Sequence, residues 1–130
     1  MKKILIIAIA FFSIQIGSAQ EQTSQQKDTI YDYKDVDVKP DFPNGMGDFY
    51  KFIAKNYIIP NVKNISGKVY IAFIIEKDGS IEEVKILRDL SFGTGEEAIR
   101  VLKKSPKWIP AQLNGEKVRC RFNVPISIQS

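Results

Sequence analysis

The sequence has no histidine among its 130 residues and only one cysteine, Cys120. Histidine is the usual general base of hydrolases and a frequent metal ligand, so its absence excludes the common Ser–His and Cys–His pairs and most zinc sites. A single cysteine cannot form an internal disulfide, so the fold has to rest on packing alone. Cys120 lies on the apolar face of a predicted strand, where we expect a buried and inert thiol.

Other residue types with catalytic potential occur without partners. In the pairs Glu82–Glu83 and Glu96–Glu97, adjacent side chains on a strand or a helix point in different directions, so we interpret these carboxylates as solvated surface charges. The glycines within residues 45–47 and 93–95 do not lie between a strand and a helix of a parallel unit, so they are poor phosphate loops. We predict that the protein is not an enzyme and has no catalytic residues, no cofactor and no metal. An exported enzyme that uses carboxylates alone, or an enzyme inhibitor, is kept as the third alternative.

Long apolar stretches are also missing. The longest, residues 4–16, contains two polar residues and is shorter than the roughly 20 residues that a membrane-spanning helix needs. Two lysines precede it, and Gly17 and Ala19 follow with the small side chains typical of a signal peptidase site. We predict a signal peptide over residues 1–19, cleaved after Ala19, and a periplasmic location. If the signal is not cleaved, the chain is anchored in the inner membrane.

Charge divides the rest of the chain into two regions. Residues 20–41 contain 3 basic and 6 acidic residues (net −3), and residues 42–130 contain 14 basic and 9 acidic residues (net +5). We predict a disordered acidic linker over residues 20–41, although weak alternation over residues 30–38 is also compatible with an extended segment along a sheet edge. Export excludes nucleic acid as a partner of the basic region, which favours an acidic segment or an anionic surface instead.

Hydrophobic periodicity predicts two helices and three strands in residues 42–130. One helix follows Met46 and ends before Pro60, and a second follows Thr94 and ends before Pro106. The strands are expected over residues 67–75, 81–88 and 118–128.

Short motifs predict how these elements are joined. Asp78–Gly79 and Asn114–Gly115 favour tight turns with positive φ. Thr94 and Glu97 have the spacing of a capping box, in which the threonine hydroxyl accepts a hydrogen bond from the Glu97 amide. Trp108, between two prolines, is expected to pack the end of the second helix onto the sheet. The predicted fold class is α+β: a three-stranded antiparallel sheet with two helices packed on one face, preceded by a disordered tail.

The last strand has one apolar face and one polar face. The inward positions are Val118, Cys120, Phe122, Val124, Ile126 and Ile128, and the outward ones are Lys117, Arg119, Arg121, Asn123 and Ser127. Pro125 interrupts the strand, and proline belongs on sheet edges because it has no N–H to donate. We therefore predict an edge strand. Its cations either only protect the edge from indiscriminate pairing or leave it open to one specific extended segment.

A set of short motifs follows in a fixed order through the domain. They are Phe42-Pro43, Ala54-Lys55-Asn56, the spacing from Pro60 to Gly67, Glu76-Lys77-Asp78-Gly79-Ser80-Ile81, Glu96-Glu97-Ala98, Pro106-Lys107-Trp108-Ile109-Pro110 and Gly115-Glu116-Lys117-Val118. Together these motifs resemble the C-terminal domain of TonB, the periplasmic protein that grips outer-membrane transporters. We therefore assign residues 42–130 to a TonB C-terminal-like domain. The family usually has a tyrosine directly before the proline that corresponds to Pro60, where this sequence has Ile59.

The resemblance implies where a partner would bind. Family members bind the short N-terminal box of an outer-membrane transporter by strand pairing, which implies a partner-binding role for Arg119, Arg121, Phe122, Asn123, Val124, Pro125 and Ile126. It also implies a second contact in the stretch before Pro60.

Besides the exported enzyme or enzyme inhibitor named above, these expectations define two alternative functions. The first is a periplasmic TonB-like binding module that engages outer-membrane transporters by strand addition and is linked to energy-dependent uptake. The second is an adaptor or structural module of an envelope complex with a different protein partner. An edge strand is also compatible with pairing of two copies of the chain into a homodimer.

Overall fold

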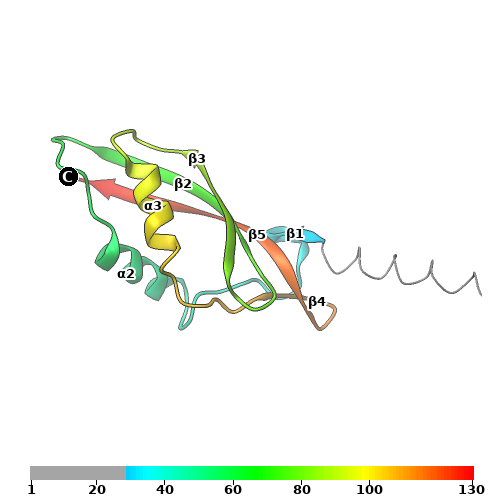
Figure 1. Ribbon diagram of the computed structural model, residues 1–130. Helices are drawn as coiled ribbons and strands as arrows, with labels where there is room; N and C mark the ends of the chain where they lie inside the picture. The colour runs from blue at the N-terminus through cyan, green and yellow to red at the C-terminus, as the bar shows by residue number, and fades with distance from the viewer. Residues whose placement is uncertain (1–28) are drawn as a thin grey trace, which may run out of the picture.

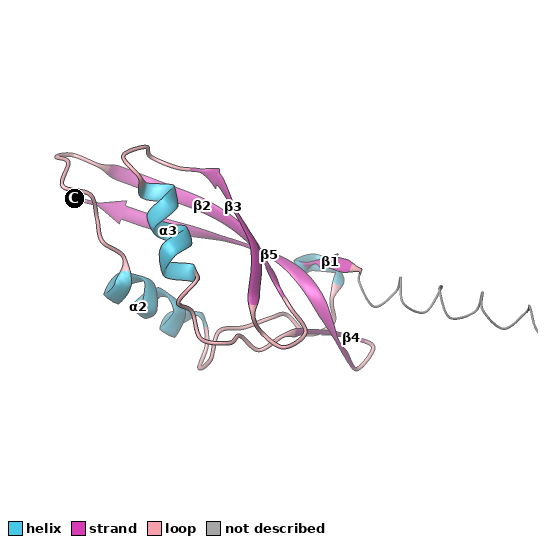
Figure 2. Cartoon of the chain, in the orientation of Figure 1, coloured by secondary structure: helices cyan, strands magenta, loops and turns pink. Residues whose placement is uncertain are grey.

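Two helices pack against one face of a twisted sheet (Figures 1 and 2). The computed structural model describes residues 29–130. The predicted signal peptide and residues 20–28 of the predicted linker lie outside the described residues. Within the described residues, no helix combines the length and the apolar character that crossing a membrane requires.

The sheet contains more strands than the sequence predicts. The elements are β1 (Ile30–Asp32), the 3-10 turn η2 (Tyr33–Asp35), α2 (Met46–Asn56), β2 (Ser66–Ile75), β3 (Ile81–Arg88), α3 (Thr94–Leu102), β4 (Ala111–Leu113) and β5 (Glu116–Gln129). The strand order is β1-β5-β2-β3, with β4 paired to β5, and β1 runs parallel to β5 while the other pairs are antiparallel. The predicted α+β class and both helices are confirmed. The prediction of three antiparallel strands is wrong in extent, because the short strands β1 and β4 make the sheet larger and mixed.

The core lies between the helices and one face of the sheet. The centre of β2 is buried because its alternate side chains from Val69 to Ile75 lie under the helices. Phe49 and Ile53 come from α2, and α3 contributes Ala98, Val101 and Leu102. Burying each large apolar side chain contributes about 1.5–3 kcal/mol, so this layer is the main source of stability in a domain without disulfides.

Trp108 closes this core at the end of the sheet where β4 begins. The centre of its ring lies 5.2–5.6 Å from the ring centres of Phe42, Phe49, Phe73 and Phe122. Its Nε1 donates to the Ser105 hydroxyl at 2.9 Å, so the buried indole nitrogen is satisfied. The predicted anchor role of this residue is confirmed.

The β2–β3 hairpin rests directly on the Trp108 backbone. Gly79 has a φ of 89°, and a Cβ added there would lie 2.1 Å from the Trp108 carbonyl oxygen. The Trp108 amide donates to the Gly79 carbonyl at 2.8 Å. The Asp78–Gly79 motif therefore marks both a turn and a close approach of two backbones. The second predicted turn, Asn114–Gly115, joins β4 to β5 with φ values of 53° and 82°.

The predicted capping box does not form. Gly93 is the N-cap residue of α3, with a φ of 78°, and no side chain caps the helix. The Thr94 hydroxyl instead donates to the Ser91 carbonyl at 2.8 Å and accepts from the Leu90 amide at 3.0 Å. It therefore ties the loop before α3 rather than its first turn, and the Glu97 carboxylate is left available for contacts elsewhere.

The second half of the predicted linker is ordered. Val36 is only 6% exposed and packs with Ala111 and Cys120 in a small separate cluster. The Asp37 and Val38 amides both donate to the Gln112 carbonyl, at 2.9 and 3.0 Å. Disorder was the wrong expectation for residues 30–41, because this segment covers apolar side chains of β4 and β5 that would otherwise face water. Burial raises the pKa of the Cys120 thiol to about 11, as expected for an inert cysteine.

Candidate functional site

The side of β5 that faces away from β2 is only partly covered. β2 pairs with β5 through ten consecutive positions, from Ser66 opposite Gln129 to Ile75 opposite Cys120. On the other side, β1 pairs with residues 119–121. From residue 122 to residue 129, that side has no strand partner in the part of the chain that the structure describes. We call residues 122–129 the open edge.

The structure divides the predicted partner-binding residues into two groups. Phe122, Asn123, Val124, Pro125 and Ile126 lie on the open edge. Val124 and Ile126 point into the core, whereas Asn123 and Pro125 lie on the opposite face of the sheet.

The two predicted arginines lie beside β1 rather than on the open edge. Arg119 pairs with Ile30 in the ladder, and its guanidinium binds the Glu76 carboxylate at 2.8 and 3.0 Å. Arg121 pairs with Asp32, and Arg121 Nη1 lies 3.3 Å from Asp32 Oδ1. The weak alternation over residues 30–38 left open an extended segment along a sheet edge, but it did not show that this segment pairs with β5.

The open edge begins and ends at a hollow in the surface. A groove of about 490 Å³ lies at its start and is lined by Asp32, Tyr33, Lys34, Arg121, Phe122 and Asn123. A second hollow of about 330 Å³ lies at its end, lined by residues 60–64 and Ser130. Eight strand residues at about 3.3 Å each span about 25 Å, which is the length available to an added strand.

Aromatic packing fixes the wall of the first groove. The Tyr33 ring lies 5.3 Å from the Phe122 ring, and Lys39 Nζ lies 4.9 Å above the Tyr33 ring centre. The Lys39 ammonium also donates to the Tyr33 carbonyl at 2.6 Å. These contacts hold η2 against the start of the open edge.

The other outer strand, β3, is irregular. Tyr70 pairs with Arg88 and Ile71 with Ile86, so Leu87 is an extra residue in β3. A second irregularity lies between Ala72 and Ile74, near Glu83, which has a φ of 51°. Such bulges bend and twist a strand, so they make its edge a poor template for pairing.

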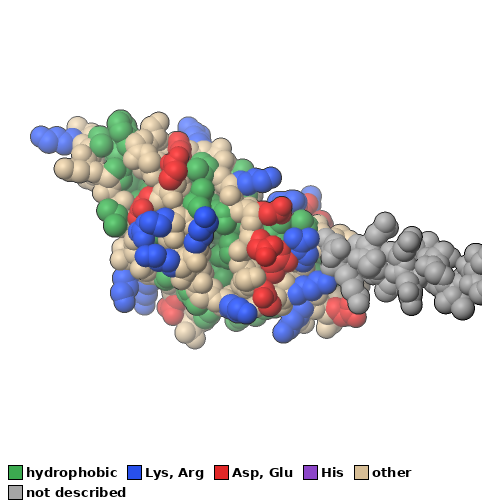
Figure 3. All heavy atoms as spheres, in the orientation of Figure 1, with side chains coloured by type: hydrophobic (Ala, Val, Ile, Leu, Met, Phe, Trp, Pro, Cys, Tyr) green, Lys and Arg blue, Asp and Glu red, His purple; other side chains and the backbone are tan. Residues whose placement is uncertain are grey.

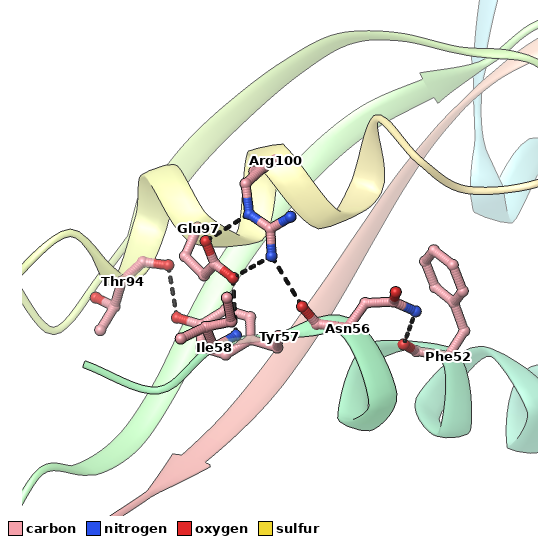
Figure 4. Close-up of polar contacts among 7 residues, drawn as sticks. All are labelled: Phe52, Asn56, Tyr57, Ile58, Thr94, Glu97 and Arg100. Atoms are coloured by element: carbon pink, nitrogen blue, oxygen red, sulfur yellow. Dashed lines mark hydrogen bonds and ion pairs between the residues drawn. The ribbon is translucent and has the colours of Figure 1, made fainter. Parts of the chain in front are cut away.

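A polar network holds the connection between α2 and β2 (Figure 4). The Glu97 carboxylate accepts from the Ile58 amide at 2.7 Å and from Arg100 at 2.6 and 2.7 Å. Arg100 Nη2 also donates to the Asn56 carbonyl at 2.8 Å, and the Tyr57 hydroxyl donates to the Thr94 carbonyl at 2.7 Å. The Arg100 guanidinium holds the pKa of Glu97 below its usual value, and burial, with Glu97 nearby, raises the pKa of Tyr57 to about 12.

This network presents two apolar side chains to solvent. Ile58 is 69% exposed and Ile59 is 43% exposed, directly before Pro60. Because Glu97 fixes the Ile58 backbone, the two side chains are held at a defined place instead of collapsing onto the core. The sequence signal for this network is the spacing of three residues between Glu97 and Arg100, which favours an ion pair on a helix. From the sequence, Glu97 was instead expected to form a capping box.

The described residues offer little for chemistry. None of them forms a cluster of three or more potential metal ligands, and none of their buried side-chain polar atoms lacks a hydrogen-bond partner. The lowered pKa of Glu76 and the raised pKa of Glu82 arise because Arg119 binds the first carboxylate and the second lies beside the first. On the face drawn in Figure 3, basic side chains alternate with acidic and apolar ones, so that face is not a continuous basic surface.

Comparison with known proteins gives a direct assignment. The family described as Gram-negative bacterial TonB protein C-terminal matches residues 61–127, which is more than half of the 130-residue chain. No curated protein matches the sequence. The chain therefore belongs to the TonB C-terminal family, whose domains are non-enzymatic protein-interaction modules of the cell envelope that engage outer-membrane transporters.

Proposed function

We propose that the protein binds an extended segment of an outer-membrane transporter by adding it as a strand to the open edge of β5, and that it thereby takes part in energy-dependent uptake. The supporting observation is the unpaired side of residues 122–129, next to ten uninterrupted pairs with β2. An added strand gains backbone hydrogen bonds from a ladder that is already ordered, so only the partner loses conformational freedom.

Pro125 indicates which backbone groups face the partner. It lies inside the unbroken register with β2, opposite Tyr70, so its nitrogen has to face away from β2. Backbone groups along a strand alternate between its two sides, so the N–H groups of Asn123 and Ser127 face the open edge as well. The open edge therefore offers a partner strand the N–H donors of Asn123 and Ser127, with no donor at Pro125 between them.

The proposed location is the periplasm, reached through a signal peptide over residues 1–19 that is cleaved after Ala19. Residues 42–130 form the binding domain in this proposal, and the ordered part of residues 20–41 packs on it.

A crosslinking pull-down from cell envelopes tests the proposal. The tagged protein is treated with a lysine-reactive crosslinker, and its partners are identified by mass spectrometry. We expect transporters, with crosslinks from Lys68, which lies opposite Ser127, and from Lys117 to their N-terminal segments. Recovery of other envelope proteins without any transporter would remove the uptake function.

A matched pair of variants tests strand addition itself. Asn123→Pro removes an outward N–H, whereas Asn123→Ala removes the side chain and keeps the N–H. We expect the proline variant to lose transporter capture and the alanine variant to retain it. Equal capture by both variants would contradict backbone pairing at this edge.

The exposed pair Ile58–Ile59 favours the alternative, an adaptor or structural module of an envelope complex with a different protein partner, because it offers an apolar surface separate from the open edge. The network around Glu97 holds this pair outside the open edge. Ile58→Glu would then abolish capture of one partner while the partner that depends on Asn123 is still recovered. If Ile58→Glu leaves every captured protein unchanged, the adaptor function has no support.

A further inference from the structure

The edge of β5 continues without interruption from the open part into the part that β1 covers. The register with β2 has no bulge between residues 120 and 129. β1 occupies only the positions opposite residues 119–121, on the same side as the open edge. The chain thus places a strand of its own on the surface that the proposed function assigns to a partner.

We propose that β1 is a displaceable occupant of this docking edge, and that the partner is a longer extended segment with an acidic residue that takes the place of Asp32 against Arg121. This inference rests on the proposed function above. It adds the chemistry of the partner and the step that its binding requires.

β1 is held weakly. It contributes three parallel pairs, and parallel pairing is less stable per residue than antiparallel pairing. Its ion pair with Arg121 is 3.3 Å long, and both side chains are about half exposed (51% and 53%), so solvent screens most of the attraction. η2, which follows it, has no buried residue.

A firm anchor begins directly after the weak part. Val36 is buried, and the amides of Asp37 and Val38 bind the Gln112 carbonyl. Residues 30–35 can therefore lift away while residues 36–41 stay in place. The contacts that open are the three ladder pairs of β1, the Asp32–Arg121 ion pair and the packing of Tyr31 against the cluster around Val36. The contacts of Tyr33 with the Phe122 ring and with Lys39 open as well.

Replacement of β1 by a partner is favourable because the partner gains more than it displaces. A segment that covers the positions opposite residues 119–121 repeats the pairs of β1, and its acidic residue repeats the ion pair with Arg121. The same segment then continues along residues 122–129, where β1 makes no pairs. The acidic requirement follows from the residue that the chain itself places there, Asp32.

A disulfide that locks β1 in place tests the displacement. Asp32 and Arg121 are paired residues on neighbouring strands. Neighbouring strands lie about 4.8 Å apart, within the range of about 4.4–6.8 Å that a disulfide spans between Cα atoms. In the variant with Asp32→Cys and Arg121→Cys, we expect the oxidised form to capture transporters at least about tenfold less than the reduced form of the same protein.

The reduced form controls for the loss of both side chains. Equal capture by the oxidised and reduced forms would overturn the displacement of β1 while leaving strand addition intact. Failure of the unmodified protein to capture any transporter would overturn the proposed function instead. The two failures are therefore distinguishable.

A second pair of variants does not depend on a disulfide. Asp32→Lys places two cations side by side and should loosen β1, so we expect capture to rise a few fold and the amides of residues 30–32 to exchange with solvent faster. Asp35→Lys makes the same charge change in η2, beyond the three paired positions, and should change neither quantity. If Asp32→Lys leaves both capture and exchange unchanged, β1 is a fixed part of the sheet and the inference fails.

Discussion

The two edges that the main sheet exposes, one along β3 and one along the open edge of β5, are built in opposite ways. β3 contains two irregularities in eight residues, one at the extra residue Leu87 and one near Glu83 with its positive φ. β5 pairs with β2 through ten regular positions and leaves residues 122–129 open. Natural sheets avoid unwanted pairing by bending their edges, and only one of these edges is bent. The regular edge is therefore the one to which the proposed function assigns the partner.

The largest expected effect is on capture of the partner, compared between a variant in the open edge of β5 and a variant in β3. Ser127→Pro removes an outward donor and adds a ring at the open edge. It should weaken capture of the partner by about ten- to a hundredfold, since a partner carbonyl left without a donor costs about 1–3 kcal/mol. Leu87→Lys changes a side chain of β3 that is 56% exposed and should leave capture unchanged. Quantitative pull-downs compare the two.

Ser127→Ala is the control for the first variant, because it keeps the backbone donor. If Leu87→Lys weakens capture as much as Ser127→Pro does, the contrast between the two edges is mistaken.

A second prediction concerns the joint that positions β3. Gly79→Ala forces a Cβ toward the Trp108 carbonyl at a positive φ, so the hairpin has to shift. We expect the free energy of unfolding to fall by about 2 kcal/mol or more, measured by chemical denaturation. Gly115→Ala, which has a similar φ but nothing within 4 Å of the added Cβ, should cost clearly less. Equal losses would show that the contact with Trp108 adds nothing to the strain of the turn.

A third prediction uses the lowered pKa of Glu97. A carboxyl whose pKa is lower in the folded state stabilises the fold above its unfolded pKa of about 4.3, and this contribution is lost as the pH falls through the folded value. Glu97→Gln should lower the melting temperature at neutral pH by about 2–4 °C, since the pair with Arg100 is partly screened. The difference from the unmodified protein should vanish at acidic pH. A difference that persists there would mean that the charge is not responsible.

The smallest expected effect lies at the second irregularity of β3. Glu83 adopts a φ of 51°, which glycine tolerates better than glutamate. Glu83→Gly should raise the free energy of unfolding by about 0.5–1 kcal/mol, because a strained residue is relieved. A loss of stability would indicate that the glutamate side chain has a structural role that its exposure does not reveal.

The sequence predicts well wherever an element is long or a turn has a strict residue requirement. The alternation from Val118 to Ile128 and the Asn114–Gly115 turn describe β5 and the turn before it correctly, because period two and positive φ leave few other solutions. The short strand β4 was not predicted. The residues around Trp108 were also identified as a packing point. In the site, Phe122–Ile126 were placed on an edge by Pro125 alone.

The errors have two physical origins. β1 is only three residues long, so the alternation over residues 30–38 is too weak to decide between an extended segment and disorder, and the strand forms because β5 supplies the ladder. The capping box failed because Gly93 adopts the cap geometry and the Thr94 hydroxyl binds the preceding loop instead. The bulges of β3 depend on its register against β2, which no local motif encodes. The errors at β1 and β3 concern pairing between strands, whereas the capping error lies within a loop of a few residues.

The unequal lengths of the ladders on the two sides of β5 also determine how the domain would respond to tension. A pull along β5 loads its ten pairs with β2 together, as shear, so no single pair bears the force. A pull on the segment that leads into β1 is opposed by only three pairs before it reaches the anchor at Val36. Under load from its N-terminal side, the chain would yield first at β1 and would lengthen the available edge while the sheet remains intact.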